Sequence, residues 1–124
     1  VGLTIGFVPE LSKKIYAGAD MFLMPSQSEP CGLAQMIALR YGTIPIVRET
    51  GGLRDSIHDA GDKNGNGFTF KSYNAHDMLD AVVRARAYYD DKMKWGRLVN
   101  TALKQNFSWT KSAKDYIALY NDIH

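Results

Sequence analysis

The chain has 124 residues, of which 45% are hydrophobic and 23% are charged, a composition typical of one globular domain. Lys and Arg number 15 and Asp and Glu 13, and the formal charge of +2 excludes strong bulk attraction to nucleic acid or to an anionic membrane. The single cysteine, Cys31, excludes an intrachain disulfide, and the longest apolar run, residues 21–25, is too short to cross a bilayer. We therefore expect a soluble, cytoplasmic domain or a piece of one, with no nucleic-acid or membrane partner.

Strand-like and helix-like segments alternate in the first half of the chain. Residues 21–24 are a continuous apolar run, which is typical of a parallel strand buried on both faces. Residues 30–41 are apolar nearly all round a helix and stop at Gly42, a common residue after a helix C-terminus. With residues 43–47 as the next strand, these segments form a βαβ unit. Before this unit we expect a strand at residues 2–8, ended by Pro9, and a helix at residues 11–19 with Ser12 as its cap.

The second half of the chain is predicted to be mostly helical. Residues 50–52 form a glycine turn that begins a short helix toward Ile57. The Gly- and Asn-rich residues 59–67 indicate a loop before a short strand at residues 68–70. Asn74, with Asp77 three residues later, is typical of a helix start. We expect three further helices, at about residues 75–89, 95–103 and 110–120.

The last predicted helix carries an aromatic stripe of Trp109, Tyr116 and Tyr120, which we expect to pack in the core. About four strands can be counted, fewer than a complete doubly wound domain contains. The sequence therefore predicts an α/β fold: a partial Rossmann-like parallel sheet of about four strands, flanked by helices, with a helical C-terminal tail. We expect the chain to be a piece of a larger domain.

The segment around Glu29 is the strongest candidate for a site. It follows a predicted parallel strand, at the sheet edge where open α/β folds bind their ligands. In the predicted helix the first amides, those of residues 31–34, have no partner within the helix and favour an anion such as phosphate. Gly32 has no side chain that would keep an anion away from these amides. Glu29 then either contacts a sugar hydroxyl or a developing cation, or it only caps the helix.

Several other segments and residues have a structural interpretation as well as a functional one. Residues 50–52 present backbone amides at a second strand end or form a plain turn. Residues 62–67 resemble the first half of a calcium loop, but Tyr73 stands where a bidentate Glu is needed, so a solvated turn is expected. By spacing alone, Phe7 is interpreted as core and Cys31 as a small, half-buried residue. No metal or cofactor is expected, because the three histidines, His58, His76 and His124, are not spaced in the sequence as metal ligands are.

Three strings carry a resemblance to a known family: residues 26–35 (SQSEPCGLAQ), residues 40–48 (RYGTIPIVR) and residues 50–55 (TGGLRD). Together with residues 107–109 and Tyr116, they resemble the bacterial glycogen synthase and plant starch synthase family over essentially the whole chain. The resemblance implies a retaining glucosyltransferase of the GT-B type, with two Rossmann-like domains across a cleft. Such an enzyme transfers glucose from ADP-glucose to the non-reducing end of an α-1,4-glucan. Residues 1–124 would form a portion of its C-terminal, nucleotide-sugar-binding domain.

The resemblance also implies roles for individual residues. Glu29 matches the essential carboxylate that holds the donor glucose, and Phe7 matches an aromatic side chain that lies against adenine. Ala34 stands where the family commonly has threonine, so its side chain has no hydroxyl for a phosphate. The backbone around it matches the stretch that contacts glucose and diphosphate. The expected catalytic residue is Glu29, and the expected substrate-binding residues are Phe7, Cys31, Gly32, Leu33, Ala34, Thr50, Gly51 and Gly52.

The partners implied by the resemblance are the ADP-glucose donor, the α-1,4-glucan acceptor and the missing N-terminal portion of a parent enzyme. That portion would supply a lysine-bearing glycine loop and the Arg and Lys that meet the diphosphate, so the chain alone is expected to be inactive. In the family the last helix crosses back to the other domain, so the resemblance implies that part of the aromatic stripe is exposed or repacked in this chain. Ile37 stands where many related retaining transferases carry a second glutamate, which favours the glycogen and starch synthase branch. The alternatives are a sucrose-synthase-like transferase and a non-catalytic module that binds a nucleotide or a glucan.

Overall fold

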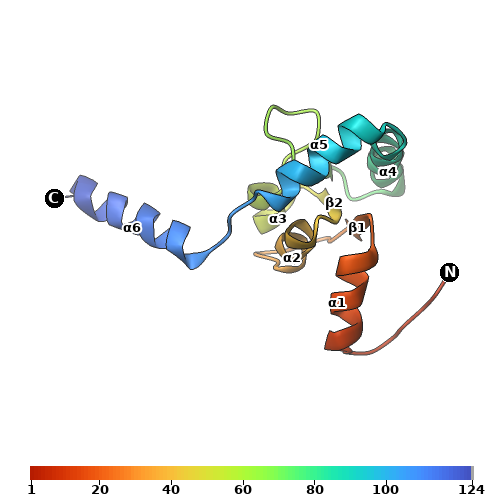
Figure 1. Cartoon of the computed structure of the whole chain (residues 1–124), viewed down its shortest axis with the longest axis horizontal. Helices are drawn as coiled ribbons and strands as arrows, with labels where there is room; N and C mark the ends of the chain where they lie inside the picture. Colours follow the sequence, from red (N-terminus) through yellow and green to blue (C-terminus); the bar gives the residue numbers. More distant parts are fainter. Residues whose placement is uncertain (124) are drawn as a thin grey trace.

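The computed structural model describes residues 1–123 and shows helices around a small parallel sheet (Figure 1). The sheet has the order β1-β2-β3, and both strand pairs are parallel. The α/β prediction, with a partial parallel sheet and a helical C-terminal tail, is confirmed. The strands are β1 (Met21–Met24), β2 (Ile44–Arg48) and β3 (Phe68–Phe70), and the helices are α1 (Pro9–Gly18), α2 (Ala34–Tyr41), α3 (Gly51–Ser56), α4 (Ala75–Asp90), α5 (Lys92–Leu103) and α6 (Trp109–Ile123).

The register brings the carboxyl ends of the strands to one edge of the sheet. Met24 pairs with Val47, and Arg48 pairs with Phe70. The central strand β2 is almost completely buried, as its apolar, β-branched sequence predicts. The edge strand β1 is only partly buried, with Leu23 44% exposed, so the expectation that it is buried on both faces is wrong. The preceding helix, α1, buries none of its residues, although the Tyr16 ring contacts the Phe22 ring of β1, with 5.4 Å between the ring centroids.

The core lies between the sheet and helices α2, α4 and α5. Small residues let α4 approach β2 and β3 closely, and Ala81 and Ala85 are fully buried there. Local signals set the helix limits as predicted: the Asn74 side chain accepts a hydrogen bond from the Asp77 amide (2.9 Å), and Gly42 ends α2 in the left-handed region. The core residues are Leu39, Ile44, Ile46, Val47, Leu53, Ile57, Phe68, Phe70, Ala81, Ala85, Leu98 and Ala102.

The strand predicted at residues 2–8 is not present. These residues form an exposed, irregular segment that runs away from the sheet (Figure 1), and the described chain therefore has three strands rather than about four. The apolar side chains of Leu3, Ile5 and Phe7 alternate as in a strand, yet all three are exposed. A strand needs a neighbour for its backbone hydrogen bonds, and this segment pairs with none of the described strands. The cap predicted at Ser12 is also wrong, because its hydroxyl donates to the Val8 carbonyl from inside α1.

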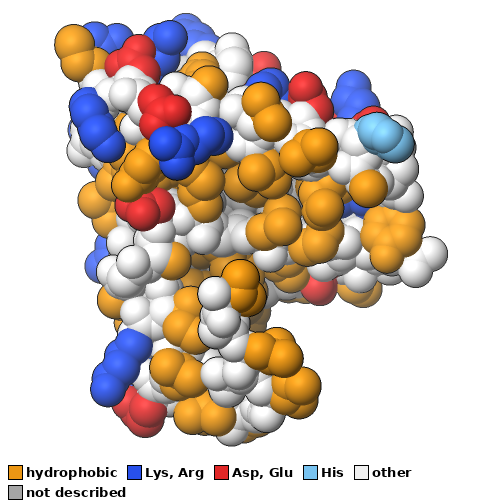
Figure 2. Space-filling view, turned by 90° about the vertical axis from the view of Figure 1, so that its right-hand side faces the viewer, with side chains coloured by type: hydrophobic (Ala, Val, Ile, Leu, Met, Phe, Trp, Pro, Cys, Tyr) orange, Lys and Arg blue, Asp and Glu red, His pale blue; other side chains and the backbone are white. Residues whose placement is uncertain are grey.

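The last helix, α6, extends away from the rest of the molecule (Figure 1) and buries none of its residues. Trp109 is 88% exposed and Tyr116 and Tyr120 are each 60% exposed, so the prediction that this stripe packs in the core is wrong. An amphipathic helix shows that an apolar face exists, but not what covers it. On the face shown in Figure 2, hydrophobic side chains cover much of the surface. Along residues 1–123, every helix is too short or too polar to span a membrane.

Candidate functional site

Glu29 lies in an irregular loop, residues 25–33, that follows β1 at the carboxyl edge of the sheet. Its side chain is half-buried. The helix after this loop begins at Ala34 rather than at Pro30, and its first backbone bond runs from the Ile37 amide to the Leu33 carbonyl. Gly32 has a φ of 68°, which interrupts any helix through this position. The amides at the N-terminus of α2 are therefore those of residues 34–36, and residues 31–33 belong to the preceding turn.

The second glycine-containing segment packs directly on this loop. Helix α3 begins at Gly51, and the amide of Gly52 donates to the carbonyls of Glu29 and Pro30, each at 3.2 Å. A Cβ atom at Gly51 would overlap the Glu29 carbonyl oxygen, and one at Gly52 would overlap the Cys31 carbonyl oxygen. Two motifs that are about 20 residues apart in the sequence are therefore in direct contact. The Gly52 amide is occupied by this contact, so the interpretation of residues 50–52 as a source of free amides does not hold for Gly52.

The side chain of Gln35 contacts both segments. It is fully buried, and its Nε2 lies 2.8 Å from the Gly32 carbonyl oxygen and 3.3 Å from that of Cys31. The same Nε2 lies 3.1 Å from the Ser56 hydroxyl, which donates to the Gly52 carbonyl (2.6 Å). Its Oε1 is buried without a hydrogen-bond partner among the described residues. Sequence reasoning missed Gln35, although a single amide side chain on an otherwise apolar helix face was a usable signal.

Arg48, the last residue of β2, contacts the same loop nearer to β1. Its guanidinium donates to the carbonyls of Ser26 (3.1 Å) and Gln27 (2.7 Å). The sequence motifs did not point to a separate role for Arg48. A positive charge at the carboxyl end of a central strand is the signal that could have pointed to it.

The remaining predicted residues are less closely grouped. Phe7 is 95% exposed in the segment before α1, so its interpretation as a core residue is wrong, and the structure does not bring it to the loop. Cys31 is exposed rather than half-buried, because its backbone, not its side chain, faces α3. Leu33 is 63% exposed. Thr50 is half-buried at the N-cap of α3, where its side chain makes no capping hydrogen bond.

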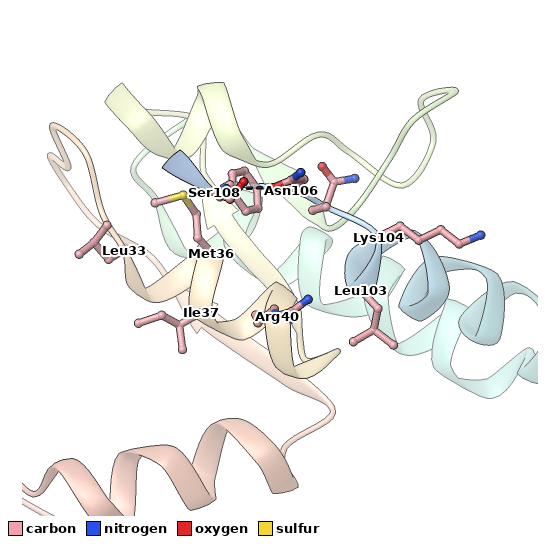
Figure 3. A pocket seen from close by; sticks show the side chains of 10 residues that line it. Leu33, Met36, Ile37, Arg40, Leu103, Lys104, Asn106 and Ser108 are labelled. Atoms are coloured by element: carbon pink, nitrogen blue, oxygen red, sulfur yellow. Dashed lines mark hydrogen bonds between the residues drawn. The ribbon is translucent and has the colours of Figure 1, made fainter. Parts of the chain in front are cut away.

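An open hollow of about 720 Å³ lies between α2 and the segment that follows α5 (Figure 3). Of the predicted site residues, it contains only Leu33. The other labelled side chains on its α2 side are Met36, Ile37 and Arg40, and Leu103 and Lys104 line it from the end of α5 (Figure 3). This hollow is mostly apolar and is separate from the contact between the Glu29 loop and α3.

Residues 59–67 form a loop before β3, as predicted. Its tip is exposed, and the carboxylate of Asp59 accepts from the Gly61 amide at 3.1 Å. At its end, Asn66 is buried and accepts from the His58 amide at 2.8 Å. Among residues 1–123, no group of three or more His, Cys, Asp or Glu side chains is placed to hold a metal ion. His124, the third histidine of the sequence, lies outside the described residues.

The parallel sheet, with a carboxylate-bearing loop at the carboxyl edge and a helix start packed against it, is the arrangement of an α/β domain that binds its ligand at the strand ends. Residues 3–97 match the family Glycosyl transferases group 1. This match spans more than half of the chain, and the chain belongs to that family.

Within this family, the chain is similar to glycogen synthases and to a starch synthase. The chain is 54% identical over 125 residues to a glycogen synthase of Anoxybacillus flavithermus (strain DSM 21510 / WK1), covering 99% of this chain and 26% of that protein. It is 54% identical over 121 residues to a glycogen synthase of Desulforudis audaxviator (strain MP104C), covering 95% of this chain and 24% of that protein. A solved structure, the catalytic domain of starch synthase IV from Arabidopsis thaliana bound to ADP and acarbose, matches with a TM-score of 0.84 and 45% identity, over 95% of this chain and 25% of that chain.

These comparisons confirm the resemblance to glycogen and starch synthases. The chain spans about a quarter of the length of the relatives that it matches.

Proposed function

We propose that this chain is part of a retaining glucosyltransferase of the glycogen and starch synthase type, and that it forms a portion of the C-terminal, nucleotide-sugar-binding domain. The observation that carries the proposal is the contact between the two glycine segments, in which the Gly52 amide binds the Glu29 and Pro30 carbonyls. The contact supports the proposal because the half-buried carboxylate lies beside two backbone turns at the carboxyl edge of a parallel sheet, where open α/β folds bind their ligands. The identity to glycogen synthases, 54% over nearly the whole chain, supports the same assignment.

In this proposal Glu29 is the catalytic residue and acts on the donor glucose. Charge develops at the sugar carbon that is transferred, and a fixed carboxylate nearby stabilises that charge more in the transition state than in the ground state. The backbone of Cys31, Gly32, Leu33 and Ala34 would contact the glucose and the diphosphate. The positive φ of Gly32 and the start of α2 at Ala34 support this role, because a left-handed residue next to a helix N-terminus is a backbone arrangement that binds anions.

The remaining predicted binding residues have secondary roles. Gly51 and Gly52 let α3 approach the loop, Thr50 precedes them, and Phe7 would lie against the adenine once its segment is held by a neighbour. The donor would be ADP-glucose and the acceptor an α-1,4-glucan, which agrees with the ADP and acarbose bound to the starch synthase relative. The partner within the same enzyme would be the rest of a longer polypeptide, located in the cytoplasm.

A transfer assay tests this proposal. The full-length parent polypeptide should incorporate glucose from labelled ADP-glucose into glycogen, and UDP-glucose run in parallel reports the nucleotide preference. Glu29→Ala should lower kcat by about 10²–10³-fold, the typical cost of losing one preorganised electrostatic group. It should change the affinity for ADP much less, because backbone amides hold the diphosphate in both states. Glu10→Ala, which removes an exposed carboxylate of α1, is the matched control.

The same assay run on the 124-residue chain should detect no transfer, since the diphosphate clamp and the opposite wall of the cleft are expected elsewhere in the parent. Glucose transfer by the 124-residue chain alone would contradict the proposal that part of the active site lies elsewhere in the parent polypeptide. A Glu29→Ala parent with normal kcat and poor ADP affinity would show that Glu29 binds the nucleotide rather than acting in catalysis.

A further inference from the structure

The loop that carries Glu29 has no regular secondary structure and depends on contacts from its surroundings. Three sets of contacts hold it at successive points. The Gly52 amide binds the carbonyls of Glu29 and Pro30, and the Gln35 side chain binds those of Cys31 and Gly32. The part nearest to β1, residues 26–27, is held by the Arg48 guanidinium.

Arg48 connects all three strand ends of the sheet. It is the last residue of the central strand β2, and two of its donors reach the loop after β1: Nε to the Ser26 carbonyl (3.1 Å) and NH2 to the Gln27 carbonyl (2.7 Å). The third donor, NH1, donates to the Lys71 carbonyl, which follows β3 (3.3 Å). The guanidinium also lies over the Tyr73 ring, 5.7 Å from its centroid.

The chemistry of this contact requires an arginine. Among the described residues no carboxylate pairs with Arg48, so its charge is directed at the three carbonyl oxygens. A planar guanidinium can donate in three directions at once, whereas a lysine ammonium acts as a single compact point on a flexible stem. Charge-assisted hydrogen bonds of this kind are also stronger than those between neutral groups.

We propose that Arg48 is a positioning residue that sets the place of Glu29 by fixing the loop at Ser26 and Gln27. Arg48 does not touch the donor in this proposal, and the catalytic consequence rests on the proposed function. Small displacements of a catalytic group have large effects on rate, about 10²-fold for a shift of 1 Å. Loss of the Arg48 contacts should therefore act mainly on kcat and much less on the KM for the donor.

The first arm of the test measures the loop itself in the 124-residue chain. In the wild type, the backbone order parameters of residues 26–29 should approach the roughly 0.85 of rigid structure, and Arg48→Ala should lower them toward about 0.6 or less. The order parameters of β2 should not change. Arg54→Ala is the matched control, because Arg54 is an exposed arginine of α3. If residues 26–29 stay as rigid in Arg48→Ala as in the wild type, Arg48 does not position the loop.

The second arm measures catalysis by the full-length parent. Arg48→Ala should lower kcat about 10- to 100-fold, Arg48→Lys should stay impaired, and Arg54→Ala should match the wild type. Guanidinium chloride, at concentrations far below those that denature proteins, should restore part of the activity of Arg48→Ala, while the same concentration of NaCl should not.

The results of the two arms separate the possible explanations. Loss of activity that follows a lower Tm and is not rescued by guanidinium would overturn the proposal, because Arg48 would then serve stability alone. An inactive wild-type parent would contradict the proposed function, and the order parameters would still decide whether Arg48 fixes the loop.

Discussion

Glycine residues decide how closely the two segments of the site approach each other. A Cβ atom at Gly52 would overlap the backbone of Cys31, and one at Gly51 would overlap that of Glu29. In both cases the obstacle is a main-chain carbonyl, which cannot move aside as a flexible side chain can. Gly96, in the middle of α5, has nothing within 4 Å of the position that a Cβ would take.

This contrast gives a matched pair of substitutions. Gly52→Ala should lower the free energy of unfolding of the chain by about 1–3 kcal/mol, the usual range for overpacking a tight contact. Gly96→Ala should raise it by about 0.5–1 kcal/mol, because alanine loses less entropy than glycine inside a helix. Chemical denaturation of the two variants and the wild type measures both effects. Equal effects of the two substitutions would contradict the close contact between α3 and the Glu29 loop.

Among the secondary-structure elements, β3 has only three residues, and side chains of its neighbours add hydrogen bonds to its pairing with β2. Asp59 accepts from the Thr69 amide (2.9 Å) and from Arg84 of α4 (2.7 Å), and Arg84 donates in turn to the Thr69 carbonyl (2.7 Å). Burial raises the pKa of Asp59, but hydrogen bonds from the Arg84 side chain and from the Thr69 and Gly61 amides lower it more. The net pKa lies below the ordinary value of 3.8.

The lowered pKa of Asp59 predicts that its carboxylate stabilises the fold at neutral pH and that this stabilisation is lost in acid. A carboxyl group whose pKa is lower in the folded state stabilises the fold above its unfolded pKa, and this stabilisation is lost as the pH falls through the folded pKa. The wild-type chain should therefore lose stability below about pH 4, and Asp59→Asn should lose less over the same range. Denaturant unfolding at a series of pH values measures this difference.

A double-mutant cycle provides the control for Asp59. Its coupling to Arg84, measured with Asp59→Asn and Arg84→Met, should be no more than about 1 kcal/mol, because the Arg84 side chain is still 38% exposed. An identical acid-side loss of stability in Asp59→Asn and the wild type would show that other groups are responsible.

At the scale of the whole molecule, the described chain consists of a packed body with two ends that contribute little to it. The segment at residues 1–8 is exposed, and α6 buries none of its residues and extends away from the body (Figure 1). Both ends carry apolar side chains, among them Phe7 and Trp109, that are almost fully exposed. In the proposed parent enzyme, these ends would pack against the rest of the polypeptide.

The separation of α6 from the body leads to a truncation experiment. Ending the chain after Ser108, directly before α6, should change the free energy of unfolding of the body by less than about 0.5 kcal/mol, the usual limit for changes that touch no buried group. Leu98→Ala, which removes a buried side chain of α5, should cost about 2–5 kcal/mol and serves as the positive control. Thermal unfolding followed by circular dichroism measures both. A large loss of stability on truncation would show that α6 packs against the body.

The sequence by itself determined most of the local structure. The Asn74 cap of α4 and the left-handed Gly42 after α2 depend on interactions between near neighbours. The apolar residues of β1 and β2 mark the segments that can form strands. The sequence also identified the two segments of the candidate site, because carboxylate and glycine patterns at strand ends have a chemical meaning before any fold is known.

Only the tertiary structure decided how these parts meet. The contact of Gly52 with the Glu29 carbonyl, and the roles of Gln35 and Arg48, depend on residues about 20 positions apart, which no local pattern specifies. The same reason explains the errors at both ends of the chain. A strand exists only where a neighbouring strand completes its hydrogen bonds, and an aromatic stripe is buried only where another surface covers it.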